Sequence, residues 1–389
     1  MNLKLSIVFA VIASSFLACR SQKPFNLQEI ETQGALETEV KMPKNIILMI
    51  GDGMGVSQIY GGMIANHNQL ALERFKHLGF IKTYSSDNII TDSGAGATAF
   101  SIGKKTFNGA IGVCPDSLAH ETILQSAALA GKSTGMVVTC AITHATPASF
   151  ATHVPDRNMY EEIAWQLVHS PVDVMIGGGR KYFDARTDGR GLIAEFQQKG
   201  IFVVDNEKAM QELPSGVRFA ALLWEDAASK KTEGRDDILP RATAQAIAHL
   251  NAQNKGFFLM VEGAQIDWGG HANETDYIVQ EMIDFDQAIA LALDFAEEDG
   301  ETLVIVTADH ETGGFALVGG NFDSGTVKGA FTSTKHTAVM VPVFAFGPGA
   351  ALFTGIQENT AIYNHMMHLW GLEVHRNPKH WKAIRPNDK

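Results

Sequence analysis

One stretch of the chain, Lys44-Asn45-Ile46-Ile47-Leu48-Met49-Ile50-Gly51-Asp52-Gly53-Met54-Gly55, joins an apolar run to a glycine-rich turn that carries one acid. The apolar run has the length and composition of a buried parallel strand. Two later segments, 256–271 and 302–314, repeat the pattern of an apolar run followed by acids, histidines and glycines. In open α/β sheets, ligands bind in the crevice outside the carboxyl ends of the strands. The three segments therefore predict one site at one edge of a sheet.

The rest of the chain shows the alternation that is typical of an α/β fold. Apolar runs near 134–140, 172–176 and 201–204 have the composition of strands, and helical stretches such as 277–298 separate such runs. This alternation predicts a mostly parallel central sheet with helices on both faces. The 389 residues, 45% of them hydrophobic, suffice for one large core. We find no Pro/Ser-rich linker or internal repeat, and we expect a single domain over residues 43–389.

The composition of the chain is acidic, with a formal net charge of −12 at pH 7. Proteins that bind the phosphates of nucleic acids need a basic surface. We therefore expect no nucleic-acid-binding surface. An anionic substrate remains compatible with this charge if bound divalent cations dominate the local field where the substrate sits.

The run from Thr91 to Ala99 places a single serine, Ser93, after an acid and among glycines and alanines. This composition suits a turn from a strand into a helix, where the N-terminal amides of the helix can hold an anion beside the hydroxyl. A serine at such a position also serves as a plain helix cap. The run alone leaves both interpretations open, and the metal-type ligands in the other segments favour a nucleophile.

Together these motifs resemble those of alkaline phosphatases. They stand in the order and approximate spacing of that family: Gly51-Asp52-Gly53-Met54-Gly55, Thr91-Asp92-Ser93, Thr146-Pro147-Ala148, Val261-Glu262-Gly263, Asp267 with His271, Ala308-Asp309-His310, and His336 with Gly347-Pro348. The resemblance covers about residues 44–372. It implies the fold of that family and an enzyme that hydrolyses small phosphate monoesters at alkaline pH. Ser93 would carry the phosphoserine intermediate, and inorganic phosphate would be released.

The resemblance also implies two zinc ions and one magnesium ion. Two neighbouring metals clamp the attacking and leaving oxygens of an in-line displacement. Zinc takes nitrogen and carboxylate ligands, whereas magnesium takes oxygen ligands. The implied ligands are Asp267, His271 and His336 for one zinc, Asp52, Asp309 and His310 with Ser93 for the second, and Asp52, Thr146 and Glu262 for magnesium.

Three further residues are assigned through the resemblance. Arg157 matches the arginine that binds two phosphate oxygens, a geometry that suits the guanidinium fork. His144 stands where some members carry an aspartate that supports magnesium through water, and a histidine there softens the third site toward zinc. Trp268 stands near the phosphate, where other members carry lysine or histidine.

The nearest alternative function is that of a phosphodiesterase from the same superfamily. Such relatives usually have a threonine nucleophile and lack the third metal, so Ser93, Glu262 and Arg157 together count against this alternative. Only 25 residues separate His310 from His336. The crown insertion that many relatives carry there must therefore be short, which leaves the mouth of the site open.

The N-terminus has the pattern of a lipoprotein-type signal peptide over residues 1–18. Lys4 precedes an apolar stretch that is too short for a membrane span and that ends in Leu17-Ala18-Cys19. We expect an exported protein of the periplasm, outer membrane or cell surface, attached to the membrane only through a lipid on Cys19, with residues 19–42 as tether. The resemblance implies a homodimer. Export permits a disulfide between Cys114 and Cys140, but two separate thiols fit the sequence equally well.

Overall fold

The computed structural model describes residues 41–372, all of which belong to one compact unit. Its strands are β1 Asn45–Gly51, β2 His77–Lys82, β3 Ser133–Ala141, β4 Val174–Gly178, β5 Phe202–Val204, β6 Phe219–Trp224, β7 Phe257–Gly263, β8 Thr302–Thr307, β9 Glu311–Thr312, β10 Ala316–Asn321, β11 Thr326–Ala330, β12 His336–Thr337, β13 Val341–Phe346 and β14 Gly355–Glu358.

Its α-helices are α1 Val56–Ala65, α2 Ser93–Ile102, α3 Ile123–Leu129, α4 Ala145–Ala151, α5 Tyr160–His169, α6 Lys181–Asp184, α7 Leu192–Gln198, α8 Glu207–Gln211, α9 Ile238–Asn251, α10 Gln265–Ala272, α11 Thr275–Asp299 and α12 Ala361–Leu369. Short 3₁₀ helices are η2 Ala71–Arg74, η3 Lys231–Glu233 and η4 Ala350–Phe353.

The largest sheet of the described chain has ten strands in the order β14-β2-β13-β8-β1-β7-β3-β4-β6-β5. Within this sheet β13 runs antiparallel to both of its neighbours, and every other neighbouring pair is parallel. The prediction of a mostly parallel α/β sheet is confirmed. The three strands that precede the ligand-rich segments lie side by side as β8-β1-β7.

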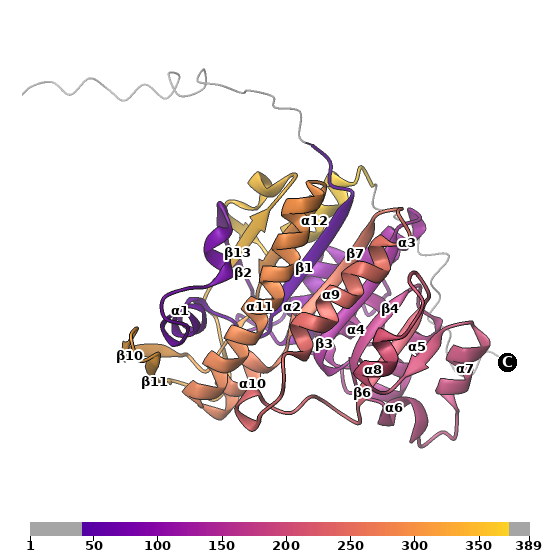
Figure 1. Ribbon diagram of the computed structural model, residues 1–389, viewed down its shortest axis with the longest axis horizontal. Helices are drawn as coiled ribbons and strands as arrows, with labels where there is room; N and C mark the ends of the chain where they lie inside the picture. The colour runs from indigo at the N-terminus through magenta and orange to yellow at the C-terminus, as the bar shows by residue number, and fades with distance from the viewer. Residues whose placement is uncertain (1–40, 373–389) are drawn as a thin grey trace, which may run out of the picture. The chain divides into compact units, whose positions relative to one another are not determined.

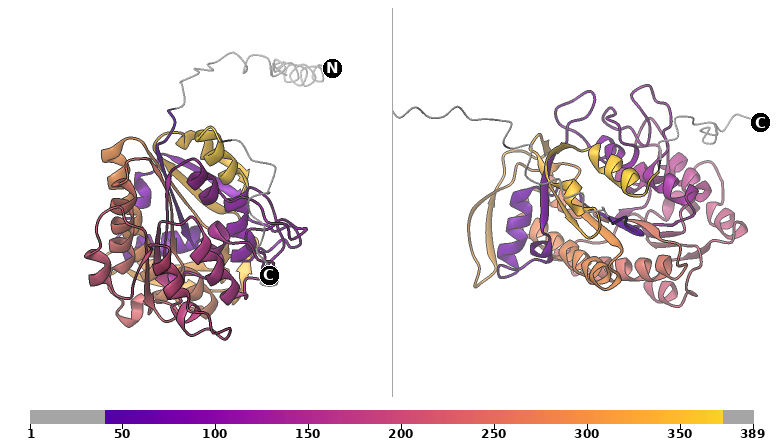
Figure 2. Two further views of the ribbon diagram at one scale, coloured as in Figure 1. Left: turned by 90° about the vertical axis from the view of Figure 1, so that its right-hand side faces the viewer. Right: turned by 90° about the horizontal axis from the view of Figure 1, so that it is seen from above.

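Helices cover both faces of this sheet, as predicted. The long helices α9 and α11 pack on one face, against β3, β7 and β8, whereas α3 and α4 pack on the other. Figure 1 shows α9 and α11 in front of the strands with α2 and α4 behind them, and the two turned views in Figure 2 show helices on each side of the sheet.

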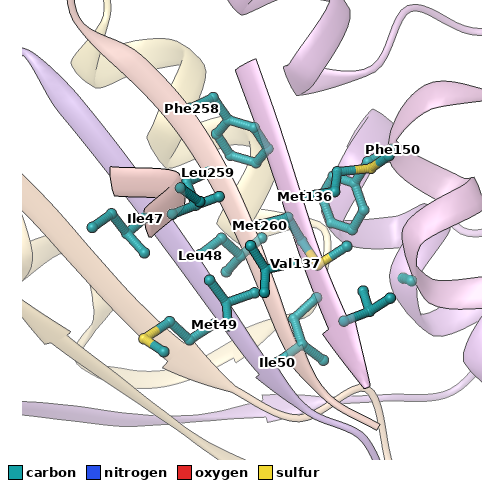
Figure 3. Packing of buried hydrophobic residues seen from close by; sticks show 14 of the residues in the cluster. Ile47, Leu48, Met49, Ile50, Met136, Val137, Phe150, Phe258, Leu259 and Met260 are labelled. Carbon is teal, nitrogen blue, oxygen red and sulfur yellow. The ribbon is translucent and has the colours of Figure 1, made fainter. Parts of the chain in front are cut away.

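The centre of the sheet is apolar because β1 and β7 are buried on both faces. Every residue of β1 and β7 is buried, which explains the unbroken apolar runs at residues 46–50 and 257–261. Figure 3 shows side chains of β1, β3 and β7 packed together. Phe150 of α4 stacks on Phe258 at a ring-centroid distance of 6.0 Å. This rigid core holds the carboxyl ends of the strands in place.

The segment between His310 and His336 forms two small antiparallel pairs. The strands β10 and β11 make a hairpin, and β12 pairs with β9 so that His336 lies opposite Thr312. The short insertion expected from the sequence thus corresponds to one hairpin. The pairing of β9 with β12 returns the chain to the strand ends and brings His336 beside His310.

Two predictions from the sequence concern the termini and the cysteines. Residues 1–40, which include most of the predicted leader and tether, lie outside the described residues, so Cys19 is untested. Among residues 41–372, no helix is both long and apolar enough to cross a membrane. Cys114 and Cys140 are both free thiols, so of the two alternatives the structure shows separate thiols.

Candidate metal centre

Three acids meet at the carboxyl edge of the sheet because their strands are neighbours. Ile50 of β1 pairs with Glu262 of β7 on one side and with Thr307 of β8 on the other. Asp52 and Asp309 each come two residues after these positions. Asp52, Glu262 and Asp309 are completely buried, with no exposed surface. The crevice predicted from the sequence is therefore lined by carboxylates.

A glycine shapes the turn after β1. Gly53 has φ = +73°, and a Cβ at this position would lie 2.7 Å from the Cα of Asp267. A residue with a side chain would be strained there and would collide with α10. The same turn lets the backbone N–H of Gly53 donate to Asp309 Oδ1 at 3.3 Å. The turn after β1 therefore lies close both to α10 and to Asp309, which follows β8.

The first group of donors consists of Asp52, Asp309 and His310, whose ligand atoms lie within 4.8 Å of one another. His310 Nε2 is 3.2 Å from Asp309 Oδ2 and 3.5 Å from Asp52 Oδ1. Both carboxylate oxygens of Asp52 and Oδ2 of Asp309 are buried without a hydrogen-bond partner. Burial, followed by the charge of Asp309, raises the pKa of Asp52 well above its ordinary value. Unpaired buried carboxylates are costly, and a bound cation would satisfy them.

The second group of donors gathers around Asp267. Asp267 and His271 are four residues apart on α10, so both project from the same face of the helix. Asp267 Oδ1 lies 3.4 Å from His271 Nε2 and 3.5 Å from His336 Nε2. Asp267 and His336 also lie within ligand-sharing distance of His310, whose ring stacks on that of His336. His310 therefore stands between the two groups.

The two histidines of this group have fixed tautomers. His271 Nδ1 lies 2.7 Å from the carbonyl of Thr334, and His336 Nδ1 lies 2.9 Å from the carbonyl of Thr91. Since a carbonyl only accepts, each Nδ1 carries the proton in the neutral ring and each Nε2 is a lone-pair acceptor. These two Nε2 atoms face each other at 3.2 Å. Two acceptors that face each other are well placed to bind one cation between them.

A third group lies where β3 meets β7. Glu262 Oε1 and Thr146 Oγ1 are buried without a hydrogen-bond partner, and Cys140 Sγ donates to Glu262 Oε2 at 3.3 Å. Burial raises the pKa of Glu262 to about 8. This group has the oxygen donors that magnesium prefers, together with a thiol.

His144 lies at the N-cap of α4, where its ring is edge-on to Trp268 at a centroid distance of 6.2 Å. Its Nδ1 is buried without a partner, and burial lowers its pKa to about 4. No hydrogen bond or ion pair joins the His144 ring to a carboxylate within residues 41–372. The structure places the His144 ring against Trp268, which follows Asp267 directly in the sequence.

Ser93 is the first residue of α2 and lies against the first group. Its Oγ is 3.3 Å from His310 Nε2, and 2% of the residue is exposed. Asp92 is the N-cap and accepts from Ala95 N at 2.9 Å and from Gly109 N at 3.0 Å. Arg157 Nη1 donates to the other Asp92 oxygen at 2.8 Å. Asp92 supplies the helix cap, so the hydroxyl of Ser93 is not used as a cap and faces His310 instead.

Some contacts of this site were missed by the sequence analysis. The carbonyls of Thr91 and Thr334 that fix the histidine tautomers have no signature in a linear sequence. The contact between Cys140 and Glu262 did have a signal. Cys140 ends the predicted strand 134–140, and strand ends are where the other donors gather.

Comparisons with known proteins agree with this geometry. The family model for alkaline phosphatase matches residues 43–328. Alkaline phosphatase 3 of Bacillus subtilis (strain 168) is 40% identical over 327 residues, covering 80% of this chain and 69% of that protein. Alkaline phosphatase of Escherichia coli (strain K12) is 31% identical over 410 residues, covering 86% of this chain and 87% of that protein.

A solved structure, alkaline phosphatase from the Antarctic bacterium TAB5, superposes with a TM-score of 0.81 at 42% identity, covering 86% of this chain and 100% of that one. Fold and donor groups define a metal-dependent hydrolase of phosphate esters. The chain belongs to the alkaline phosphatase family. It is accordingly a phosphatase that acts on phosphate monoesters.

Proposed function

We propose that this phosphatase works through a phosphoserine at Ser93, with two zinc ions and one magnesium ion, at alkaline pH. The observation that carries the proposal is the position of Ser93 Oγ, 3.3 Å from His310 Nε2 at the start of α2. There the hydroxyl adjoins buried carboxylate oxygens without hydrogen-bond partners. A serine that served only as a helix cap would not need a buried group of acids beside it.

The residues present fit three ions. Asp267, His271 and His336 would hold one zinc, and Asp52, Asp309 and His310 the second, because carboxylate and imidazole donors suit zinc. Asp52, Thr146 and Glu262 would hold magnesium, since all three offer buried oxygens without partners. A variant of the TAB5 enzyme with aspartate in place of a histidine is described with Mg bound in its M3 site. When bound, the ions supply positive charge to the oxygens of the phosphoryl group.

The chain's own residues account for the two chemical steps. Ser93 Oγ attacks phosphorus, the bond from phosphorus to the ester oxygen breaks, and the alcohol leaves after taking up a proton. Water then attacks the phosphoserine, which releases inorganic phosphate and restores the hydroxyl. Arg157 would bind two phosphoryl oxygens through its guanidinium fork. The N-terminal end of α2, which begins at Ser93, favours an anion through the helix dipole.

Replacement of the nucleophile tests the proposal directly. Ser93→Ala should lower kcat for an aryl phosphate by at least about a thousandfold and leave residual hydrolysis, because the rest of the site still acts. Zinc content should stay unchanged. The matched control is Ser101→Ala, which removes a hydroxyl from the same helix that, among residues 41–372, bonds only to the carbonyl of Thr98. Mass spectrometry of acid-quenched enzyme should find phosphate on the peptide with Ser93. Full activity in Ser93→Ala, or phosphate only on another peptide, would refute the mechanism.

The cellular setting is also part of the proposal. Residues 1–18 would be a lipoprotein signal peptide, Cys19 the lipid-anchored residue, 19–42 the tether and 43–389 the phosphatase domain. The protein would then act outside the cytoplasm as a homodimer that has no nucleic-acid-binding surface. The support is the pattern of the N-terminal sequence and the acidic composition of the chain.

A further inference from the structure

We propose that the thiol of Cys140 is a donor in the third metal site and makes that site prefer zinc over magnesium. This inference rests on the proposed function, because it concerns the site that Asp52, Thr146 and Glu262 would form, and it keeps the proposed mechanism and these ligands but replaces magnesium with zinc as the preferred ion of that site. It goes beyond the magnesium set expected from family resemblance, which contains no sulfur.

The sheet register explains why Cys140 reaches this site. Val138 of β3 pairs directly with Glu262 of β7 in parallel register, so the two side chains lie on the same face of the sheet. Cys140 comes two residues after Val138, in the stretch between Val137 and Ala141 where the pairing of β3 with β4 shifts register. The chain in this stretch brings the Cys140 side chain to Glu262. The result is a distance of 3.3 Å between Cys140 Sγ and Glu262 Oε2, with Cys140 wholly buried.

A second observation points to a ligand at this place. Glu262 Oε1, Thr146 Oγ1 and both carboxylate oxygens of Asp52 are buried and have no hydrogen-bond partner. Each of these three residues is 0% exposed, so solvent does not satisfy the oxygens. Buried polar atoms without partners are rare in native proteins and call for an ion or a water. The thiol thus borders a donor set that is already incomplete without a cation.

The distance between sulfur and oxygen agrees with two donors on one ion. Zinc binds thiolate sulfur at about 2.3 Å and carboxylate oxygen at about 2.0–2.2 Å, which places two such donors roughly 3.0 to 3.7 Å apart. The observed 3.3 Å lies inside this range. Magnesium demands oxygen ligands and keeps waters, whereas soft thiolates favour zinc. A sulfur at this position therefore discriminates between the two metals.

The alternative is that the thiol only donates a hydrogen bond to Glu262 and binds no metal. The two cases differ in a spectroscopic property. Cobalt(II) replaces zinc in many sites, and a cobalt–thiolate bond produces a near-ultraviolet charge-transfer absorption that a thiol outside the coordination sphere does not.

The test uses the full chain, stripped of metal and reloaded with cobalt(II) alone. The chain has three cysteines, so Cys19→Ser/Cys114→Ser leaves Cys140 as the sole thiol. We expect the charge-transfer band in this double variant and in Cys114→Ser, the matched control. We expect its loss in Cys140→Ser and in Cys140→Ala, which guards against a defect specific to one replacement. Absence of the band from the folded double variant, or its persistence in Cys140→Ser, would overturn the inference.

Metal selectivity provides an independent readout. After dialysis of the chain against zinc with an excess of magnesium, elemental analysis should give three zinc ions per chain, but two zinc and one magnesium ion in Cys140→Ser. Identical metal contents would contradict the proposal. These outcomes are separate from the phosphoserine test. A cobalt–thiolate band without phosphate on Ser93 would refute the phosphoserine mechanism and support Cys140 as a metal donor. Phosphate on Ser93 without the band would support the mechanism and refute Cys140 as a donor.

Discussion

Arg157 donates from Nη1 to Asp92 Oδ2 at 2.8 Å, and Asp92 is the residue that caps the helix starting at Ser93. The candidate phosphate-binding arginine is thus tied to the residue directly before the candidate nucleophile. Burial opposes the charge of Asp92, but Arg157 and the amides of Ala95 and Gly109 outweigh it and hold the pKa of Asp92 below its ordinary value. Asp92 therefore orients the arginine and the helix start together.

Removal of the Arg157 guanidinium should weaken phosphate binding. Arg157→Ala should cost about 1.5 to 3 kcal/mol of binding free energy, the range for hydrogen bonds to charged groups. This corresponds to a roughly 10- to 150-fold higher inhibition constant for inorganic phosphate. Arg157→Lys keeps the positive charge but loses the guanidinium fork. Its inhibition constant for inorganic phosphate should therefore lie between those of the unaltered protein and of Arg157→Ala. Unchanged phosphate inhibition in Arg157→Ala at equal metal content would show that Arg157 does not contact phosphate.

Two replacements of Asp92 should separate its cap from its charge. Asp92→Ala removes the acceptor for Ala95 N, and loss of such a cap costs about 1 kcal/mol of unfolding free energy. Asp92→Asn keeps an oxygen for the cap but removes the charge that faces Arg157. We expect Asp92→Ala to be the less stable in urea unfolding. Both variants should show weaker phosphate inhibition, because Arg157 is no longer held. Equal stability of the two would contradict the capping role.

Metal removal should destabilise the protein, and more so at higher pH. In the metal-free site burial raises the pKa of Asp52, that of Asp309 to about 6 and that of Glu262 to about 8. These carboxyl groups bind more protons in the folded than in the unfolded state, so their contribution to stability falls as pH rises. Burial lowers the pKa of His310 and of His144, and these groups act in the opposite direction below about pH 6.5, so we expect the fall in stability between about pH 6.5 and 8. The pKa of Asp267 is lowered, so Asp267 stabilises the folded state, and this stabilisation is fully present above about pH 4. It therefore does not change with pH over the range considered.

Thermal unfolding with and without a chelator checks this expectation at pH 5, 6.5 and 8. The difference in Tm between the metal-loaded and metal-free protein should grow with pH. Metal binding itself works in the same direction, because the ligands must be deprotonated. A Tm difference that is constant, or that shrinks toward pH 8, would mean that these carboxylates do not share one site.

Glu262→Gln should affect monoesters more than diesters. A monoester presents an extra negative oxygen, so a cation held near it stabilises the monoester transition state more than that of a diester. The expected result is a large fall in kcat/KM for an aryl monoester and a small one for the matched diester. The diester is the internal control for folding and for zinc binding. Equal proportional losses on both substrates would show that Glu262 only holds the site together.

Cys19→Ser should release the protein from the membrane fraction. Cys19 lies outside the described residues. The proposed lipid on Cys19 supplies the membrane affinity, because this affinity increases with the length of acyl chain that is buried in the bilayer. Cys114→Ser is the matched control and should stay with the membrane. Fractionation followed by a phosphatase assay measures both. An unaltered protein that is wholly soluble would point to ordinary signal cleavage instead of lipidation.

Much of the fold followed from local patterns. Residues 46–50, 257–261 and 303–306 are apolar throughout because these strands are buried on both faces, and such runs can be recognised as strands from the sequence alone. Parallel strands share one carboxyl edge, so the sequence predicts that the acids after them lie at that edge. The strand order β8-β1-β7 confirms this edge. The assignment of individual ligands to ions stays a prediction.

Side-chain relationships across the sheet could not be obtained in the same way. The facing Nε2 atoms of His271 and His336 depend on carbonyls 63 and 245 residues away, and Cys140 meets Glu262 across 122 residues. Such contacts depend on which strands are neighbours, on their register and on how each side chain is oriented. Periodicity in the sequence specifies which faces are apolar, because burial acts on each residue separately. Contacts between distant donors arise only when the packed sheet brings their strand ends together.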